Sequence, residues 1–355
     1  MKILHIITSL YTGGAESLVS QIAPMIRDAG HEVEVVSFIG RKTPFRQALE
    51  EHGITVHFFA ESCSVYDPRI IPWLRSIIKG FDIVHTHNTT PQFFAAMAAR
   101  GLHCRLVTTE HNTNNRRRDW MLGRAMDRWL YSRYDATICI ARIAETRLRD
   151  FLGESSGNIC TINNGIDLSR YSEASMLPEF RKDGETAVTM VAGFRPQKDQ
   201  DTLIKAMALL PENFTLNLVG AGERMEACRQ LAAAERVADR VRFLGLRTDV
   251  PEILKSSDII VMSSHYEGLS LSSVEGMASG RPMIASDVDG LREVVGGAGI
   301  LFEEGNARQL ADEILKLATD RAHYDAVADR CRRHALNYDI SSMVDKYCRI
   351  YDSLK

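Results

Sequence analysis

The sequence predicts an α/β protein made of two doubly wound, Rossmann-like domains, and three observations support this fold class. The chain has 355 residues, which is too long for one ordinary hydrophobic core. Short apolar runs typical of buried parallel strands alternate with helical stretches in both halves of the chain. A polar stretch without a clear period, residues 169–185, separates the two series. We therefore expect domains at residues 1–170 and 186–336 and a terminal segment at 337–355.

The first domain opens with a strand at residues 3–7, a helix at 17–29 and a second strand at 31–36. This βαβ order implies a parallel sheet with right-handed crossovers. Further strands are expected at 55–59, 82–85, 105–109, 136–140 and 159–163, with helices between them.

The second domain repeats the same alternation. Its expected strands are residues 187–193, 215–220, 241–244, 259–262, 282–285 and 300–301. Its expected helices are 202–210, 225–234, 250–256 and a stretch from 307 to about 336, with a last helix at 341–354. Ligands of such sheets bind outside the carboxyl ends of the strands, so we expect the site in a cleft where the two domains face each other.

Composition limits the classes of function and location. The chain is 45% hydrophobic and 25% charged, and its net charge of −3 argues against a nucleic-acid binder. Its seven cysteines are odd in number and widely spaced, so neither a disulfide framework nor a zinc knuckle is indicated, and a reduced, cytoplasmic compartment fits best. The apolar run at residues 3–7 is too short for a signal peptide or a membrane span.

The stretch at residues 263–278 carries the strongest chemical signal. It follows an apolar strand, contains the turn Gly268-Leu269-Ser270-Leu271, and then enters a helix. Backbone N–H groups at a strand tip and a helix N-terminus favour an anion. Glu267 and Glu275 bracket the turn. A competing interpretation is that Ser272 and Glu275 form a capping box, which would explain Glu275 but not Glu267.

Two further loops of the second domain contain candidate ligand-binding residues. Arg195 and Lys198 follow the strand that begins this domain, so both cations can converge on a phosphate group. The alternative, two solvated surface cations, is less favoured because these residues lie at a strand tip. Gly220-Ala221-Gly222 follows the next strand but lacks the third glycine of a dinucleotide fingerprint.

Polar residues also follow strands of the first domain. Gly13 and Gly14 come after the first strand and allow close approach of backbone to a ligand. His85 and His87 point the same way from one strand, and His111 ends the next. Three imidazoles suit zinc, but no carboxylate-backed ligand spacing accompanies them. We expect polar lining of a sugar pocket instead, with His111 as a hydrogen-bonding residue near the reacting sugar.

Taken together, these loops resemble the retaining, nucleotide-sugar-dependent glycosyltransferases of family 4, which have the two-domain GT-B fold. Glu267 and Glu275 match the E-x7-E motif of that family, and residues 193–198 match its diphosphate loop. Residues 13–16 match its glycine loop, and residues 164–167 match its N-G-I/V-D segment. The resemblance covers nearly the whole chain in the right order. It implies that the last helix crosses back to the first domain.

The resemblance also implies roles for these residues. Arg195 and Lys198 would neutralise the donor diphosphate, together with backbone N–H groups near Gly268, Leu269, Ser270 and Leu271. Glu267 would hold the donor sugar and Glu275 the ribose, while His111 would contact the sugar near its reacting face. The remaining donor-binding residues would be Gly14, Gly193, Gly220, Gly222 and Leu246. No metal or other cofactor is implied. The sequence Gln197-Lys198-Asp199 departs from the family pattern and leaves the shape of this loop open.

A segment rich in arginine and tryptophan is the candidate for contact with the acceptor. It contains Arg116, Arg117, Arg118 and Trp120. This segment could dock on anionic lipid headgroups at the cytoplasmic face of a membrane, or it could belong to an ordinary solvated helix. We expect a transferase that moves a hexose or N-acetylhexosamine, favouring a UDP-sugar donor, to a glycan or lipid-linked acceptor in polysaccharide or surface-glycan synthesis. The alternatives are a nucleotide-sugar 2-epimerase and a non-catalytic nucleotide-sugar-binding subunit.

Overall fold

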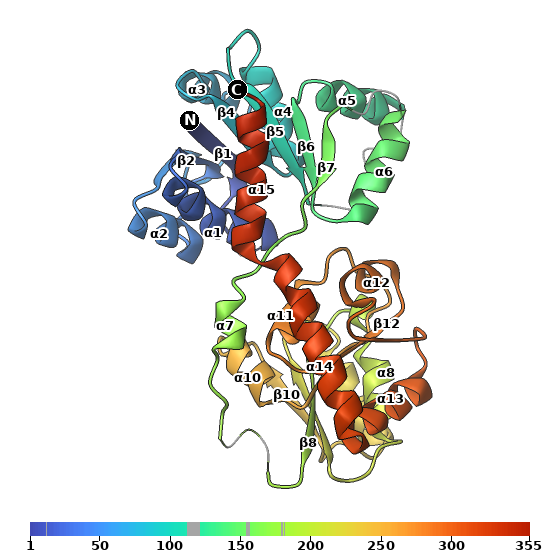
Figure 1. The fold of residues 1–355 in the computed structure, drawn as a ribbon. Helices are drawn as coiled ribbons and strands as arrows, with labels where there is room; N and C mark the ends of the chain where they lie inside the picture. Colours follow the sequence, from blue (N-terminus) through green and yellow to red (C-terminus); the bar gives the residue numbers. More distant parts are fainter. Residues whose placement is uncertain (12, 112–120, 154–156, 179, 181) are drawn as a thin grey trace. The chain divides into compact units, whose positions relative to one another are not determined.

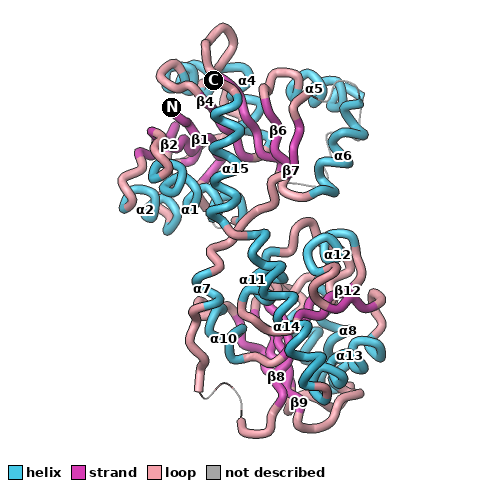
Figure 2. Tube along the Cα trace, in the orientation of Figure 1, coloured by secondary structure: helices cyan, strands magenta, loops and turns pink. Residues whose placement is uncertain are grey.

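The structure is a computed structural model that describes residues 1–355 except residues 12, 112–120, 154–156, 179 and 181. The chain divides into two compact units. The first unit is Met1–Asn164 together with Ser341–Lys355, and the second unit is Gly165–Ile340. Each unit is a parallel sheet flanked by helices, as predicted (Figures 1 and 2). Both sheets fit the expected doubly wound, Rossmann-like fold class.

The sheet of the first unit has the strand order β3-β2-β1-β4-β5-β6-β7. The inner strands are buried because both faces of the sheet are covered; Ile3, Leu4, Ile6 and Ile7 of β1 are fully buried, and so are all five residues of β4. The strands are β1 (Lys2–Ser9), β2 (Glu32–Ile39), β3 (Thr55–Ala60), β4 (Ile83–His87), β5 (Arg105–Glu110), β6 (Ala136–Cys139) and β7 (Ile159–Thr161). The helices are α1 (Gly14–Asp28), α2 (Pro44–Glu51), α3 (Ile70–Ile78), α4 (Thr89–Ala98), α5 (Met121–Tyr131) and α6 (Arg142–Leu152).

The last helix, α15 (Ile340–Ser353), packs on the sheet of the first unit (Figure 1). Tyr347 and Tyr351 on this helix are fully buried. The Tyr351 hydroxyl is hydrogen-bonded to His85 Nδ1 on β4 at 2.6 Å, and Arg105 Nε donates to the Leu354 carbonyl at 3.0 Å. The end of the chain is therefore part of the core of the unit that contains its beginning.

The sheet of the second unit has the strand order β10-β9-β8-β11-β12-β13. Its strands are β8 (Thr186–Val191), β9 (Phe214–Val219), β10 (Val241–Gly245), β11 (Ile259–Met262), β12 (Met283–Ser286) and β13 (Ile300–Phe302). Its helices are α8 (Gln200–Met207), α9 (Met225–Ala234), α10 (Val250–Ser256), α11 (Leu271–Ala278), α12 (Asp289–Val295), α13 (Ala307–Thr319) and α14 (Arg321–Ala335). The expected helical stretch from 307 is thus two helices, because Asp320 caps α14 through the His323 N–H.

The division of the chain differs from the predicted boundaries at residues 170 and 337. Residues from Gly165 onward already belong to the second unit, and so do residues up to Ile340. A backbone bridge between Ile166 and Asp339 ties the two crossing segments together. A β-carbon at Gly165 would lie 2.6 Å from Ile340 Cα, so only glycine fits this crossing. The expected linker also contains a short helix, α7 (Ser169–Ser172), whose Tyr171 is buried.

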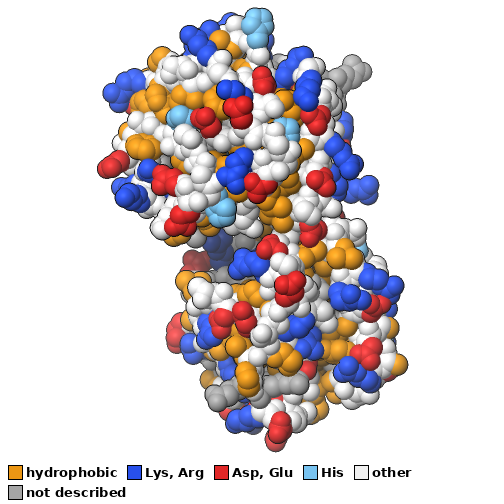
Figure 3. All heavy atoms as spheres, turned by 60° about the vertical axis from the view of Figure 1, so that its left-hand side comes forward, with side chains coloured by type: hydrophobic (Ala, Val, Ile, Leu, Met, Phe, Trp, Pro, Cys, Tyr) orange, Lys and Arg blue, Asp and Glu red, His pale blue; other side chains and the backbone are white. Residues whose placement is uncertain are grey.

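The surface carries charges of both signs. On the face shown in Figure 3, lysine and arginine side chains are interspersed with aspartate and glutamate on each unit, in agreement with the small net charge of −3. Within the described residues, every helix is too short or too polar to cross a membrane.

Candidate active site

The strand order of the second unit reverses between β8 and β11. From β8 the sheet continues to β9 and β10 on one side, and from β11 to β12 and β13 on the other. Ligands of open α/β sheets bind outside the carboxyl ends of the strands at such a switch point. The loop after β8 contains Arg195 and Lys198, and the loop after β11 contains Glu267. The topology therefore brings the predicted cations and the predicted glutamate to one edge of the sheet.

Lys198 and Glu267 form an ion pair at this edge. Lys198 Nζ lies 2.5 Å from Glu267 Oε1, and the Ser264 hydroxyl donates to the same oxygen at 2.7 Å. The two charged side chains are only 18% and 11% exposed. Solvent and salt screen such a pair less than a surface pair, so the attraction holds both side chains in place. Sequence reasoning did not name Ser264 as a site residue, although it lies in the predicted stretch, two residues after the end of β11.

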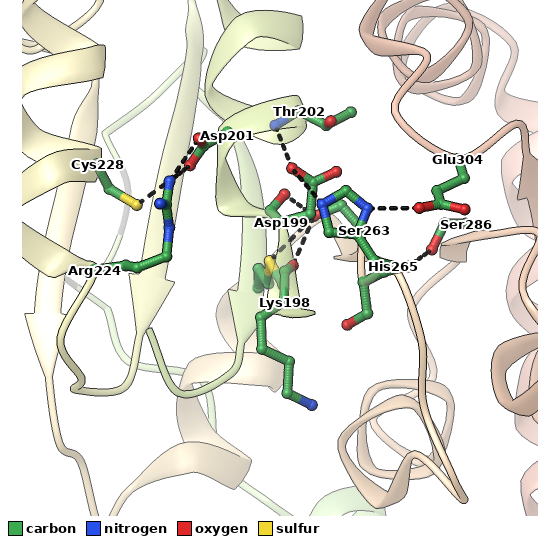
Figure 4. Close-up of polar contacts among 12 residues, drawn as sticks. Lys198, Asp199, Asp201, Thr202, Arg224, Cys228, Ser263, His265, Ser286 and Glu304 are labelled. Carbon is green, nitrogen blue, oxygen red and sulfur yellow. Dashed lines mark hydrogen bonds and ion pairs between the residues drawn. The ribbon is translucent and has the colours of Figure 1, made fainter. Parts of the chain in front are cut away.

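Contacts between the two loops fix the backbone around this pair (Figure 4). The His265 N–H donates to the Gln197 carbonyl at 2.8 Å, and the Ser263 hydroxyl donates to the Asp199 carbonyl at 2.7 Å. His265 Nδ1 is hydrogen-bonded to Glu304 Oε1 at 2.6 Å. Figure 4 shows the amino group of Lys198 pointing away from the contact between Asp199 and His265. These contacts anchor the loop on the side opposite to the Lys198 amino group, and the anchored loop fixes the direction of the lysine side chain.

The shape of the loop after β8, which the sequence leaves open, follows from its residues. Pro196–Lys198 forms a single 3-10 turn, and Asp199 then adopts the left-handed conformation with φ of 47°. The Asp199 carboxylate caps α8 by accepting from the Thr202 N–H at 3.2 Å. Aspartate is one of the few residues other than glycine that tolerate this conformation, and it is a favoured cap. Asp199 therefore takes the turning role that glycine would have after Lys198.

Gly220 and Gly222 let the loop after β9 approach the loop after β8. Their φ angles are +141° and +157°. A β-carbon would lie 2.1 Å from the Ala192 carbonyl oxygen at Gly220 and 2.3 Å from the Phe194 carbonyl oxygen at Gly222. Backbone hydrogen bonds join the same segments, including Phe194 N–H to the Ala221 carbonyl at 3.0 Å. These glycines therefore have a packing role that supports the segment from Gly193 to Arg195.

The turn before α11 has the predicted strand-to-helix form. The helix begins at Leu271, and Ser270 occupies the N-cap position in an extended conformation. The first-turn N–H groups of a helix have no partner within the helix and favour an anion. The Ser273 hydroxyl donates to the Ser270 hydroxyl at 2.8 Å. Gly268, Leu269 and Ser270 thus form the turn that leads from Glu267 to the first-turn N–H groups of α11, which begin at Leu271.

A second glycine, which sequence reasoning did not single out, supports this turn. A β-carbon at Gly290, in the first turn of α12, would lie 2.1 Å from the Gly268 carbonyl oxygen and 2.3 Å from the Glu267 carbonyl oxygen. The backbone of α12 therefore touches the backbone that carries Glu267. The Asp289-Gly290 pair is typical of a turn, so the sequence carried no signal for this close contact.

We expect Gly290→Ala to displace the loop that carries Glu267. Overpacking of this kind costs about 1–3 kcal/mol of unfolding free energy. Thermal denaturation should show the loss, and KM for the donor should rise because Glu267 moves. Gly157→Ala is the matched control, since a β-carbon there meets open space. An unchanged melting temperature and KM for Gly290→Ala would show that the contact with the loop is unimportant.

Glu275 is oriented by a tyrosine and not by a helix cap. Because α11 begins at Leu271 with Ser270 as N-cap, Ser272 is inside the helix and the capping-box interpretation is wrong. Burial raises the pKa of Glu275, and a hydrogen bond from the Tyr171 hydroxyl opposes that shift. Burial and the Glu275 charge raise the pKa of Tyr171 above its usual range. No local sequence pattern links Tyr171 on α7 to Glu275.

The other predicted donor-binding residues lie at the ends of strands. Arg195 is exposed, and Leu246, directly after β10, is 83% exposed although it is a large apolar side chain. Gly14 is the first residue of α1 in the first unit. The predicted membrane-contact residues Arg116, Arg117, Arg118 and Trp120 lie outside the described residues.

The predicted histidines are in the first unit, where His111 follows β5. His87 Nδ1 lies 3.2 Å from His111 Nε2, and His5 Nδ1 on β1 lies 3.0 Å from His87 Nε2. Burial lowers the pKa of His111 to about 4, so its imidazole is neutral near pH 7. Among the described residues, the three side chains close enough to hold a metal are His5, His85 and His87, and not the set with His111 that the sequence suggests.

Two protein-family models match the chain. The model described as Glycosyltransferase Family 4 matches residues 12–170, and the model described as Glycosyl transferases group 1 matches residues 185–320. Together they cover most of both units.

Curated relatives and a solved structure extend these matches over nearly the whole chain. A phosphatidyl-myo-inositol mannosyltransferase of Mycolicibacterium smegmatis is 26% identical over 96% of this chain and 90% of its own length. An N-acetyl-alpha-D-glucosaminyl L-malate synthase of Bacillus anthracis is 25% identical over 96% of this chain and 93% of its own. The structure of HepE from Anabaena in complex with UDP superimposes with a TM-score of 0.87 at 23% identity, covering 99% of this chain and 100% of that one.

The two parallel sheets and these matches define a glycosyltransferase with the GT-B fold. The chain belongs to the family 4 type of these enzymes.

Proposed function

We propose that the protein is a retaining glycosyltransferase that moves a hexose or N-acetylhexosamine from a nucleotide diphosphate sugar to a glycan or lipid-linked acceptor. The observation that carries this proposal is the Lys198–Glu267 ion pair at the switch point of the second unit. It places a cation and a carboxylate side by side, next to the N-terminus of α11. A diphosphate and the hydroxyls of the attached sugar need those two kinds of group.

In the proposed reaction the bond between the anomeric carbon and the diphosphate oxygen breaks, and its electron pair leaves with the diphosphate. Lys198, Arg195 and the backbone donors of residues 268–271 stabilise the charge that develops there. The acceptor hydroxyl attacks the same face of the sugar and transfers its proton to the departing phosphate. Glu267 accepts hydrogen bonds from the donor sugar hydroxyls, and His111 donates one near the reacting face.

The nucleoside has its own proposed contacts. Glu275, oriented by Tyr171, accepts from the ribose hydroxyls, and the exposed Leu246 side chain supports the base. Gly193, Gly220 and Gly222 keep the backbone close to the diphosphate, and Gly14 is a further proposed donor-binding residue. We favour UDP because the HepE structure of the same fold contains UDP. The names of the relatives contain different sugars, so we propose the donor sugar only as a hexose or N-acetylhexosamine.

The proposed enzyme needs no divalent metal, because Lys198 and Arg195 supply the positive charge at the leaving group. We expect an excess of EDTA to leave the transfer rate unchanged and added Mn²⁺ to give no increase. A rate that falls with EDTA and returns with Mn²⁺ would disprove this part. NMR of the product should show the same anomeric configuration as the donor.

We expect a UDP-sugar to stabilise the protein more than GDP- or ADP-sugars do in a thermal-shift assay. At a hundredfold excess over Kd the stabilisation is about 2.7 kcal/mol, which is read as a rise in melting temperature. No shift with any nucleotide sugar would contradict the proposal. Incubation with UDP-sugars alone tests the 2-epimerase alternative, since an epimer formed without release of UDP would overturn the transferase. The relatives named above favour the transferase.

A further inference from the structure

Four histidines on adjacent strands of the first unit lie close together, and three of them are fully buried while His111 is partly exposed. His5 is on β1, His85 and His87 are on β4, and His111 follows β5. The sheet order places β4 between β1 and β5, and His5 pairs with His85 in the strand register. His5, His85 and His87 are fully buried. His85 and His87 are two residues apart on β4, so their side chains lie on the same face of the sheet. The ring of His87 contacts the rings of both His85 and His5.

Three of these imidazoles form a chain of hydrogen bonds that ends at His111. His5 Nδ1 lies 3.0 Å from His87 Nε2, and His87 Nδ1 lies 3.2 Å from His111 Nε2. Burial lowers the pKa of His5 to about 3 and that of His87 well below its usual value. Each ring is therefore neutral and has one N–H donor and one acceptor nitrogen. The N–H groups of the chain can point toward His111 or away from it, and only one direction can hold at a time.

The far end of the chain decides the direction. His5 Nε2 is buried and has no hydrogen-bond partner among the residues that the structure describes. If the N–H groups pointed away from His111, this nitrogen would carry a buried proton with no acceptor. If they point toward His111, it carries only an unused lone pair. Orphaned buried N–H groups are rarer than under-satisfied acceptors, so the second arrangement is favoured.

We propose that His5 and His87 are positioning residues that hold His111 in its Nδ1–H tautomer, by donating along the chain from His5 to His87 to His111. The proton of His111 then lies on Nδ1, and His111 meets its ligand as a hydrogen-bond donor. The benefit to catalysis rests on the proposed function, in which His111 donates to the donor sugar. The tautomer itself does not depend on that function and is measured without any sugar.

A metal ion is the competing use of the same cluster, since nitrogen atoms of His5, His85 and His87 lie within 4.8 Å of one another. Both nitrogens of His85 are already hydrogen-bonded, to the Tyr351 hydroxyl at 2.6 Å and the Thr109 hydroxyl at 2.7 Å. Both nitrogens of His87 belong to the chain. A metal would have to break hydrogen bonds that satisfy buried polar atoms. The hydrogen-bonded network accounts for more of the observed contacts.

The test reads tautomers by long-range ¹H–¹⁵N NMR of the full-length protein labelled with ¹⁵N-histidine, near pH 7 and without donor. We expect His5, His87 and His111 in the Nδ1–H form, whereas a free histidine side chain prefers the Nε2–H form. In His87→Phe, His111 should revert to Nε2–H. Tyr351→Phe is the matched control, because it removes a hydroxyl from the same cluster outside the chain and should leave the His111 tautomer unchanged.

His111 in the Nε2–H form in the unmodified protein would overturn the proposal, and that measurement requires no variant to fold. Shifts of the His5, His85 and His87 nitrogens on adding equimolar Zn²⁺ would overturn it in favour of the metal site. We also expect kcat of His87→Phe to fall roughly 10–100-fold, the range seen when a partner that orients a metal-bound imidazole is removed. If the tautomers are as expected but His111→Gln keeps full activity, the hydrogen-bond chain stands and the proposed role of His111 toward the sugar fails.

Discussion

Replacing Lys198 with alanine is expected to lower kcat for sugar transfer by about 10²–10³-fold, the usual effect of removing one preorganised group that stabilises developing charge. Lys198 is 18% exposed and lies 2.5 Å from Glu267, so no water molecule or mobile surface cation can easily take its place. Steady-state kinetics with a UDP-sugar and an acceptor glycan measure the effect. UDP alone should also bind more weakly, because Lys198 is proposed to contact the diphosphate.

Lys205→Ala is the control for this variant, because Lys205 is exposed on α8, the helix that follows the same loop. It should keep normal kcat and normal UDP affinity. Full turnover by Lys198→Ala would refute the assignment of the diphosphate site. Circular dichroism of both variants shows whether a loss of activity is a loss of fold.

Replacing Glu267 with glutamine should separate the sugar from the nucleotide. Glutamine keeps the size of the side chain and an oxygen that can accept from Ser264, but it loses the charge. A hydrogen bond to a charged group contributes about 1.5–3 kcal/mol, so the UDP-sugar should bind roughly 10–100-fold more weakly. UDP alone should bind with nearly unchanged affinity, since Glu267 is proposed to contact only the sugar. Isothermal titration with both ligands measures the difference.

Glu226→Gln serves as the control, because Glu226 is exposed on α9 in the same unit. It should leave both affinities unchanged. Equal weakening of UDP and UDP-sugar by Glu267→Gln would mean that Glu267 acts only by holding Lys198, and the sugar contact would then be wrong.

Much of the secondary structure could be predicted because its signals are local. The strand at residues 259–262 and the helices at 225–234 and 250–256 have the predicted bounds, since each apolar run ends at a clear polar or glycine boundary. Helix α12 could not be predicted in the same way. It has seven residues with a glycine at the second position, so its intrinsic propensity is poor. It is stabilised by packing, with Leu291, Val294 and Val295 buried in the core and Gly290 against the Glu267 loop.

The candidate site was partly predictable for a related reason. Polar residues after buried strands were visible in the sequence, so Arg195, Lys198 and Glu267 could be named as candidates. Their partners could not. Ser264 and Tyr171 are ordinary residues by composition. The capping-box pattern pointed to the wrong role for Glu275 because the N-cap is Ser270, two positions before Ser272.

The order of apolar and polar residues was enough to predict two doubly wound parallel sheets, with polar and glycine-containing turns at the carboxyl ends of their strands. These features follow from the local alternation of apolar, polar and glycine residues along the chain. The tertiary structure alone decided that Lys198 meets Glu267, that Gly290 supports the glutamate loop, and that His5 stands behind His87 and His111. Those contacts join segments far apart in the chain. They depend on strand order and on the packing of the whole unit, which local periodicity does not specify.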